Sequence, residues 1–326
     1  MTYDFITIGG TTRDISFFTD QGVLLDNKQD VLRQKILAFE SGAKIKVDQF
    51  FYSFGGGAAN AAVCLANFGL KTACLAPIGD DENGRLIIKN LKNRQVDTKL
   101  IKKIKNIESG SSFILVSPSG ERIIFAQRGA NRYLNLTSKE LKLVKNTKNI
   151  YLASLSGNWQ ANLRQIFLSV KKDGPKIFWN PGATQLAGGI DLLTEFMDKV
   201  EVLALNKDEA IELIVRSKGY AHLKSAYLNK TENLLKIIYS FGPKVVVITL
   251  GAAGVMAYDG RKIYQRQILK EKKRIDSTGI GDIFNATFAA GYSLYQANIN
   301  KALDLSLKNA SAKISHQGAQ NGLIKK

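Results

Sequence analysis

The chain has 326 residues, of which 45% are hydrophobic and 23% charged, and its formal net charge at pH 7 is +18. This composition is typical of a globular protein and argues against disorder. At about 100–200 residues per domain, the length predicts one large domain or two ordinary ones. Two cysteines and two histidines are too few for a disulfide framework and too scattered for a zinc site. Cys64 and Cys74 lie in apolar stretches, which predicts reduced residues in the core.

The N-terminal segment carries neither a basic stretch nor a long apolar one, so it does not resemble a secretory signal. The longest apolar runs, such as residues 245–248, are far shorter than the about 18 residues that a membrane-spanning helix needs. We therefore expect a soluble, cytoplasmic protein with no membrane partner.

The positive charge comes from 46 lysines and arginines against 28 acidic residues. Such an excess is compatible with a nucleic-acid partner or with an anionic small-molecule substrate. However, Lys139, Lys142 and Lys145 recur every three residues, which is typical of a solvated helix face. No basic run is interleaved with aromatic residues, so the sequence does not favour nucleic-acid binding.

Short apolar runs alternate with helical stretches along most of the chain. We expect strands at 5–8, 72–78, 150–152, 177–179, 202–205 and 245–250, and helices at 58–68, 82–92, 159–170, 207–215 and 231–239. Strands that alternate with helices predict an α/β fold, with a mostly parallel sheet and helices on both of its faces.

Two regions depart from this alternation. Residues 111–117 and 121–127 flank Pro118-Ser119-Gly120, which predicts a β-hairpin, and residues 14–51 lack a clean helical period. Strands that leave the main sheet of an α/β protein commonly cover its site. No internal repeat is present, and the five prolines form no linker that would divide the chain.

A glycine-rich turn leads directly into an apolar helix near residue 281. The string runs Asp276-Ser277-Thr278-Gly279-Ile280-Gly281-Asp282-Ile283-Phe284. Free amides at a helix N-terminus, unshielded by side chains at the glycines, form an anion site. A carboxylate at position 282 would repel that anion unless it receives a proton. The alternative is that Asp282 only complements the helix dipole.

A second glycine string, Gly55-Gly56-Gly57-Ala58-Ala59-Asn60, precedes an alanine-rich helix. Its glycines allow a close approach of the backbone to a ligand, and the Asn60 amide offers a donor and an acceptor to hydroxyl groups. A plain glycine turn with close helix packing explains the string equally well. Neither string has the spacing of a Walker A loop or of a Rossmann fingerprint.

Together, the two strings resemble the two signatures of the PfkB, or ribokinase-like, family of carbohydrate kinases. Further landmarks follow in the order that this family has, so that the resemblance spans nearly the whole chain: 78–84, 129–131, 180–182, 206–209, 249–251, 309–312 and 318–320. The resemblance implies a single domain over residues 1–326, with a three-layer ribokinase-like fold. A small β lid is expected from parts of residues 14–53 and 98–128.

The resemblance also implies a reaction, in which the γ-phosphoryl group of ATP is transferred, with Mg²⁺, to a hydroxyl of a sugar. Asp282 is then the general base that accepts the hydroxyl proton. The backbone amides of Gly279, Ile280 and Gly281 stabilise charge on the transferring group. Because the transition state is largely dissociative, an ordinary ionised carboxylate suffices as the base.

On the nucleotide side, the resemblance assigns Asn206 and Glu209 to the phosphates and to the water shell of Mg²⁺. Thr249, Gly251 and Asn309 would border the nucleotide. Taken singly, these residues also fit a helix cap, a surface acid and core turns.

On the acceptor side, the resemblance places Asp14, Gly56, Gly57 and Asn60 around the substrate hydroxyls, although Asp14 also fits a simple turn. The sequence departs from ribokinase itself in two places. Gly57 stands where ribokinase-like pockets carry a lysine, and Ala153-Ser154-Leu155 contains no glutamate. These departures weaken an assignment to ribose, and a nucleoside (adenosine-type) kinase is the alternative within the family. A non-catalytic or nucleic-acid-associated member of the fold is the alternative from another class.

Two further expectations come from the resemblance. A K⁺ ion is expected beside the anion site, held by Asp276 and by the backbone near residues 311–318. A homodimer is expected to form through the lid.

Overall fold

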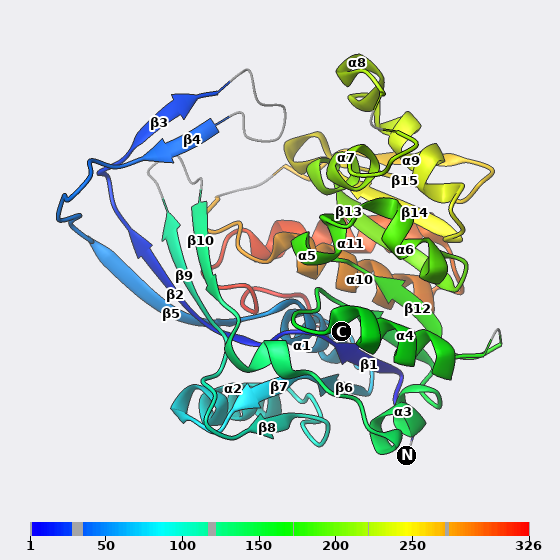
Figure 1. Cartoon of the computed structure of the whole chain (residues 1–326), viewed down its shortest axis with the longest axis horizontal. Coiled ribbons are helices and arrows are strands. Elements are labelled where there is room, and N and C mark those ends of the chain that lie inside the picture. The colour runs from blue at the N-terminus through cyan, green and yellow to red at the C-terminus, as the bar shows by residue number, and fades with distance from the viewer. Residues whose placement is uncertain are drawn as a thin grey trace.

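The computed structural model describes residues 2–27, 35–116, 122–171, 173–220, 222–270 and 274–325, and helices flank a large central sheet (Figure 1). The five helices expected from the sequence are present, with bounds that differ by one residue at most. The described helices are α1 (Gly57–Asn67), α2 (Glu82–Asn93), α3 (Ser138–Val144), α4 (Trp159–Ser169), α5 (Ala183–Leu186), α6 (Gly189–Met197), α7 (Lys207–Val215), α8 (Ser225–Leu228), α9 (Thr231–Tyr239), α10 (Ile280–Leu294) and α11 (Ile299–Lys313).

The central sheet, as far as the structure describes the chain, has eight strands in the order β16-β15-β14-β13-β12-β11-β1-β6. Neighbouring strands from β14 to β6 pair in parallel, and β15 and β16 add an antiparallel edge. Their bounds are β1 (Phe5–Ile8), β6 (Thr72–Leu75), β11 (Asn149–Leu152), β12 (Lys176–Trp179), β13 (Val200–Asn206), β14 (Val245–Thr249), β15 (Val255–Tyr258) and β16 (Ile263–Arg266). The expected, mostly parallel sheet is confirmed.

The core lies on both faces of this sheet. Successive strand side chains point to opposite faces, so Ile150 and Leu152 join one buried cluster while Tyr151 joins the other. The first cluster includes residues of α4, α6, α7 and α9, and the second includes residues of α1, α10 and α11. The sheet between two helical layers makes the three-layer, ribokinase-like fold that the sequence predicted.

A second, four-stranded sheet stands to one side of the main body and forms the lid (Figure 1). Its order is β10-β9-β2-β5, and the bounds are β2 (Thr12–Phe18), β5 (Gln49–Gly55), β9 (Ser111–Val116) and β10 (Arg122–Gln127). The antiparallel pair of β3 (Val23–Asp26) and β4 (Lys35–Ala38) lies beyond its outer end. The expected hairpin is present as β9 and β10, and its turn, Pro118-Ser119-Gly120, lies outside the described residues.

The two faces of the lid differ in chemistry. Asp14 lies opposite Ser53 and Ser112 in the strand register, and the next residue, Ile15, lies opposite Tyr52 and Phe113. Because side chains alternate along each strand, the two rows lie on opposite faces. Asp14, Ser53 and Ser112 are buried, whereas Tyr52 and Phe113 are exposed. The polar row therefore faces the main body and the aromatic row faces outward.

Two details of the fold differ from the expectations. The strand expected at 72–78 is broken, because β6 ends at Leu75 and β7 (Pro77–Gly79) pairs instead with β8 (Lys102–Ile104). Pro77 has no amide hydrogen and does not donate to a continuing ladder. The β8 strand also belongs to this small sheet, so the lid takes no strand from residues 98–110.

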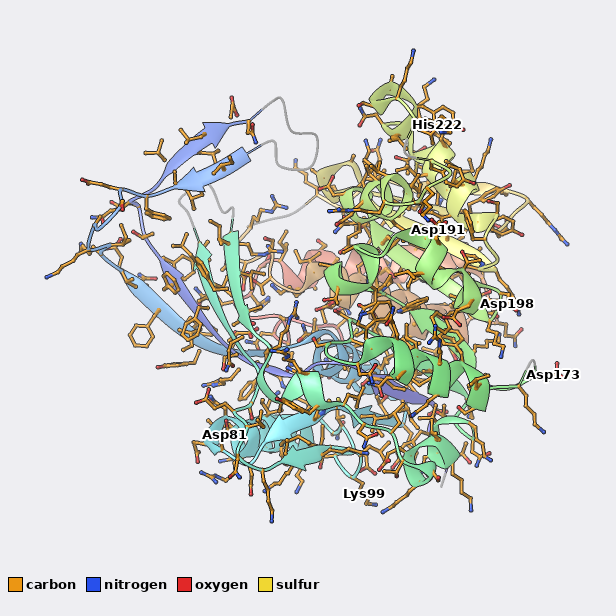
Figure 2. The ribbon with its side chains drawn as sticks, viewed as in Figure 1. Asp81, Lys99, Asp173, Asp191, Asp198 and His222 are labelled. Atoms are coloured by element: carbon orange, nitrogen blue, oxygen red, sulfur yellow. The ribbon has the colours of Figure 1, made fainter. Side chains whose placement is uncertain are left out.

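Charged side chains project from the periphery of the molecule, as Lys99, Asp173 and Asp198 show in Figure 2. Cys64 and Cys74 are buried and free, as expected. Among the described residues, no helix combines the length and apolar character that a bilayer crossing requires.

Candidate active site

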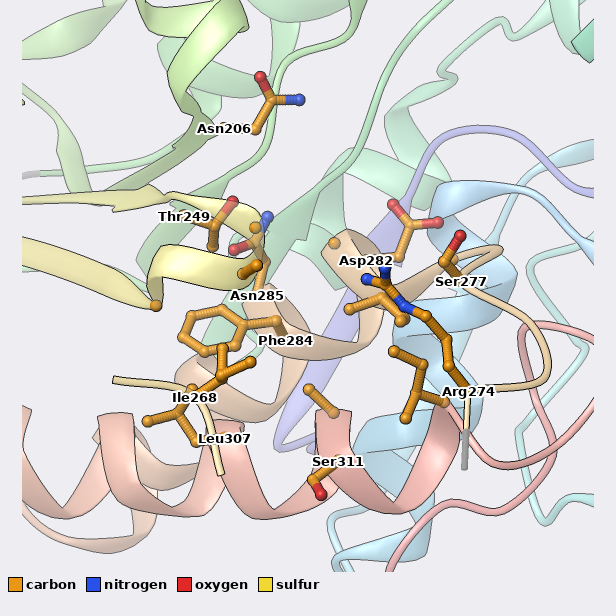
Figure 3. A pocket seen from close by; sticks show the side chains of 18 of the residues that line it. Asn206, Thr249, Ile268, Arg274, Ser277, Asp282, Phe284, Asn285, Leu307 and Ser311 are labelled. Atoms are coloured by element: carbon orange, nitrogen blue, oxygen red, sulfur yellow. The ribbon is translucent and has the colours of Figure 1, made fainter. Parts of the chain in front are cut away.

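A cavity of about 590 Å³ opens where the main sheet, the start of α10 and the lid come together (Figure 3). Asn206 and Thr249 reach it from the ends of β13 and β14, Asp282 from the first turn of α10, and Arg122 from the lid. The carboxyl edge of a parallel sheet is where α/β folds bind ligands. Segments that lie far apart in the sequence, 206–209, 249–251 and 279–282, thus contribute to one space.

The turn before α10 has the conformation that an anion site requires. Gly279 is the N-cap of α10 and has φ +70°, which favours glycine, and its carbonyl accepts from the Ile283 amide (2.9 Å). No heavy atom of another part of the chain lies within 4 Å of a Cβ built on Gly281, so the backbone is open there. The Ile280 amide donates to Ser277 O over a long 3.3 Å. All three residues line the cavity at the positive end of the helix dipole.

Asp282 is half-buried and is held by a side chain from the other glycine motif. Its Oδ2 accepts a hydrogen bond from Nδ2 of Asn60 (2.8 Å). Burial raises the pKa of Asp282, while the bond from Asn60 and the positive charge of Arg122 oppose that shift. The carboxylate is therefore oriented and has an increased affinity for a proton.

Asn60 is itself fixed by a chain of amides. Its Oδ1 accepts from Nε2 of Gln320 (3.1 Å), and Oε1 of Gln320 accepts from Nδ2 of Asn90 (2.7 Å). Both polar atoms of the Asn60 side chain are thus engaged inside the protein. Its place beside Asp282 indicates that it positions this carboxylate, in addition to bordering the acceptor space expected from the sequence.

The acceptor end contains a second buried carboxylate, Asp14. One of its oxygens, Oδ1, has no hydrogen-bond partner within the protein. Burial raises the pKa of Asp14, and the charge of Asp282 raises it further, against hydrogen bonds from Thr12 and Ser112. An unpartnered buried carboxylate oxygen is costly unless a ligand completes it.

The glycines of residues 55–57 make room for these carboxylates. A side chain at Gly55 would collide with Oδ2 of Asp14. A Cβ at Gly57 would collide with Cβ of Ala153 (2.9 Å) and would touch Oδ1 of Asp282 at an ordinary contact distance (3.6 Å). Gly56 has φ +89°, so a side chain there would be strained as well. Of the expected residues, Asn60 and Gly57 therefore lie next to Asp282, and Asp14 is close enough for the charge of Asp282 to raise its pKa.

Asn206 and Glu209 form a reciprocal cap on α7. Oδ1 of Asn206 accepts from the Glu209 amide (2.8 Å), and Oε2 of Glu209 accepts from the Asn206 amide (2.8 Å). Burial raises the pKa of Glu209 to about 7, and the charges of Asp282, Asp208 and Glu212 add to the effect. The cap expected for Asn206 is present, and both residues also line the cavity.

Sequence reasoning missed several residues of the cavity. Its apolar end is formed by Phe284, Ile268, Leu269 and Leu307, some of which Figure 3 shows together. Of these four residues, only Phe284 belongs to the glycine-rich motif of residues 276–284. Ile268 and Leu269 lie in a loop and Leu307 lies in α11, and no sequence motif marks either segment as part of a site. Asn285 also lines the cavity, and its Oδ1 is buried with no partner in the protein.

Thr249 and Gly251 line the cavity as expected, but Asn309 does not reach it. Asn309 is fully buried; its Nδ2 donates to Thr287 Oγ1 (2.8 Å) and its Oδ1 accepts from the Ile324 amide (2.8 Å). The expectation that Asn309 borders the nucleotide is corrected, because the following residues of α11, Ala310 and Ser311, line the cavity instead. Asp276 lies beneath the turn, close to the side chain of Lys313.

A family model described as pfkB family carbohydrate kinase matches residues 28–326. Mouse (Mus musculus) ribokinase is 29% identical over 282 residues, which cover 85% of this chain and 83% of the relative. The ATP-dependent 6-phosphofructokinase of Thermoanaerobacterium thermosaccharolyticum is 24% identical over 317 residues, which cover 93% of each chain.

Solved structures share the fold at low sequence identity. The ribokinase of Arabidopsis thaliana, solved with ribose and ATP, superposes with a TM-score of 0.79 at 21% identity, over 100% of this chain and 96% of the other. The Burkholderia thailandensis nucleoside kinase, in complex with inosine, has a TM-score of 0.78 at 15% identity, over 98% and 94%.

Proposed function

The chain belongs to the pfkB family of carbohydrate kinases, and from this premise we propose that it transfers the γ-phosphoryl group of ATP to a hydroxyl of a sugar. One observation carries the proposal. The Asp282 carboxylate lies at the N-terminus of α10 and lines the large cavity, its charge raises the pKa of the buried Asp14, and Asn60 orients it. A base at this point reaches both the acceptor hydroxyl and the phosphoryl group.

In the proposed reaction, an acceptor hydroxyl loses its proton to Asp282 as its oxygen bonds to the γ-phosphorus, and ADP leaves. The pKa of Asp282 is raised by burial, which favours its acceptance of this proton. The open backbone at Gly281 and the positive end of the α10 dipole stabilise negative charge on the transferring oxygens.

The donor set of the cavity suits Mg²⁺, which prefers one or two carboxylates together with phosphate oxygens and water. Glu209 supplies a carboxylate, and Asn180 supplies Oδ1, since its Nδ2 donates to Ala204 O (2.9 Å). We assign Glu209 to the water shell of the ion. When bound, the ion neutralises charge on the phosphates.

We assign the apolar end of the cavity to the adenine base. Phe284, Ile268 and Leu307 offer a slot for a flat, apolar ring, and Thr249 and Gly251 border it near the sheet. The phosphates then occupy the part of the cavity between this apolar end and Asp282.

A sugar is favoured as the acceptor because the lid row that contains Asp14 also presents Ser53 and Ser112 toward the main body. One observation supports a nucleoside instead. The inner row that contains Phe51 and Ile114 lies two residues further along the strands, where a base would pack against it.

A panel of pentoses, hexoses, sugar phosphates and nucleosides, with release of ADP as the readout, tests the proposal. We expect ATP-dependent turnover with at least one sugar, and none with the Asp282→Asn enzyme. Turnover with nucleosides alone would select the alternative, and no turnover with any acceptor would contradict a kinase function.

We also propose that two copies pair through the outer face of the lid. Phe125 and Phe113 lie side by side there, Tyr52 lies in the same row beyond Ile15, and the exposed fractions of Tyr52, Phe113 and Phe125 are 53%, 45% and 56%. An exposed aromatic patch of this kind is typical of a protein interface. A second copy of the same face would cover it.

A further inference from the structure

A lysine ammonium is buried directly beneath the glycine-rich turn of residues 276–281 that leads into α10, the anion turn. Lys313 is the last residue of α11 and is 0% exposed. Its Nζ donates to the backbone carbonyl of Asp276 (2.6 Å) and lies 3.8 Å from Oδ2 of the same residue. A charged group is buried at high cost unless it is paired, so this contact is a specific feature of the turn.

Asp276 connects that ammonium to the turn. Its Oδ1 accepts from the Thr278 amide (2.7 Å), and its Oδ2 accepts from the Gly318 amide (2.7 Å). The amides of Ile275 and Asp276 also donate to Ile314 O (2.9 and 3.2 Å), directly after Lys313. These hydrogen bonds therefore hold the start of the anion turn against the C-terminal end of α11, next to the Lys313 ammonium.

The K⁺ site expected from the sequence does not fit this geometry. The carbonyl and carboxylate oxygens of Asp276, which were expected to hold the ion, already face the Lys313 ammonium. A K⁺ ion bound to the same oxygens would lie against a like charge in a buried setting, which is unfavourable.

We propose that the Lys313 ammonium is the resident monovalent cation of this turn, so that the enzyme does not need K⁺. This inference rests on the proposed kinase function. Lys313 is a positioning residue, because it acts on the phosphoryl group only through the turn from Asp276 to Gly281. Burial lowers its pKa to about 8 against the influence of Asp276, so it is mainly charged at pH 7.

The first experiment needs no variant. Turnover and thermal unfolding of the wild-type chain are measured in tetramethylammonium buffer with and without added K⁺, at constant ionic strength. We expect equal kcat values and equal melting temperatures. A several-fold rise of kcat with K⁺, or a melting temperature that increases specifically with K⁺, would overturn the proposal.

The second experiment removes the ammonium with Lys313→Ala, which leaves a space. Since a small misplacement of catalytic groups slows the reaction strongly, kcat should fall by about tenfold or more while the KM for ATP changes little. K⁺ or methylammonium should restore part of kcat. The matched control is Lys308→Ala, an exposed lysine on the same helix, which should show neither loss nor rescue.

Thermal unfolding of the ligand-free proteins gives a readout that does not depend on turnover. K⁺ should raise the melting temperature of Lys313→Ala, since an ion that binds only the folded state stabilises it, and should leave wild type and Lys308→Ala unchanged. A Lys313→Ala protein with wild-type kcat and melting temperature would overturn the proposal. If that variant does not fold, the wild-type K⁺ series decides. If no acceptor is phosphorylated, the kinase proposal fails, whereas the melting series still decides the role of Lys313.

Discussion

Asp282 owes its orientation to a residue 222 positions away in the chain, because Asn60 donates to its Oδ2. Asn60 is held in turn by Gln320, which is 260 positions from it. The Asp282 carboxylate is therefore placed by contacts between α1, α10 and the C-terminal segment, and its orientation does not depend on its own turn alone. At the scale of single residues, this gives two clear experiments.

The first prediction concerns Asp282→Asn. The carboxamide keeps the side-chain volume and an oxygen for the bond from Asn60, but it is not a base, so kcat should fall by about 10²–10⁴-fold. ATP affinity should hold or increase slightly, because a negative charge beside the phosphates is removed. Steady-state kinetics, ATP titration and thermal unfolding on the same protein measure these effects.

Asp191→Asn is the matched control, since Asp191 also lies in the first turn of a helix, α6. If Asp282 only complements the helix dipole, both variants should lose about 0.3–1 kcal/mol of stability and keep normal turnover. An Asp282→Asn enzyme with near wild-type kcat would remove Asp282 from the mechanism.

The second prediction concerns Asp14→Asn. The pKa of Asp14 is raised in the folded state by burial, so the folded chain binds more protons than the unfolded chain between the ordinary and the raised pKa. Its ionisation therefore makes the folded state less stable as pH rises through that window. At pH 7 the variant should melt about 1–3 °C higher than wild type, and the difference should shrink as the pH falls toward the ordinary range of a carboxyl, about 4.

The same variant should bind the acceptor more weakly, because a carboxylate that accepts from a hydroxyl is lost. We expect the KM for the acceptor to rise about tenfold or more, with little change in the KM for ATP. A variant that is less stable than wild type at pH 7 would contradict the destabilising effect of the buried Asp14 carboxylate. An unchanged KM for the acceptor would contradict its role in binding.

At the scale of elements, the lid is joined to the anion turn by one arginine. Arg122 is the first residue of β10, donates a hydrogen bond to Oγ of Ser277, and lines the cavity. Its positive charge also lowers the pKa of Asp282 against the effect of burial. The lid thus adds a charge to the site in addition to covering it.

The third prediction is that Arg122→Met slows the reaction and changes its pH dependence. Loss of a positive charge near the transferring phosphoryl group should lower kcat by about tenfold. The pKa of Asp282 should rise, so the decrease of kcat at acidic pH should begin at a higher pH than in wild type.

A pH–rate profile measures both effects, with Arg128→Met as control because Arg128 is exposed and lies just after β10. An unchanged profile for Arg122→Met would show that the lid arginine does not act on the base.

At the scale of the whole molecule, the lid has an outer face that the fold leaves exposed. Phe50 and Tyr52 of β5, Phe113 of β9 and Phe125 of β10 all present rings to the surface. A single copy gains nothing by exposing such a surface, whereas a symmetric dimer buries the same patch twice.

The fourth prediction is a dimer that depends on this face. Sedimentation equilibrium at micromolar concentration should give twice the chain mass of 35.9 kDa for wild type. The double variant Phe113→Asp and Phe125→Asp should be monomeric, since burying two carboxylates from each copy at the interface is unfavourable. Leu168→Asp, at a residue that is 82% exposed on α4, should remain dimeric. A monomeric wild type would refute the pairing.

The α/β alternation and the two glycine motifs could be read from the amino-acid sequence alone, whereas the role of Asp282 as the base stays a prediction. These features are local. Apolar periodicity sets strands and helices, and a glycine-rich turn before an apolar helix specifies a helix N-terminus whatever surrounds it. For that reason the bounds of α7 and α9 and the start of α10 were predicted closely, and a helix cap at Asn206 was among the alternatives, whereas the return bond to Glu209 was not predicted.

Which of these segments contact one another could not be predicted from the sequence and follows from the tertiary fold. It placed Asn309 in the core and Ala310 at the cavity, although the two are neighbours in α11, because the rotation of that helix is set by its packing on α10. It also brought Arg122 to Asp282 through the strand register of the lid, and the Lys313 ammonium to the place expected for K⁺. Such contacts join residues tens to hundreds of positions apart, and no local pattern encodes them, since they follow from how the whole core closes.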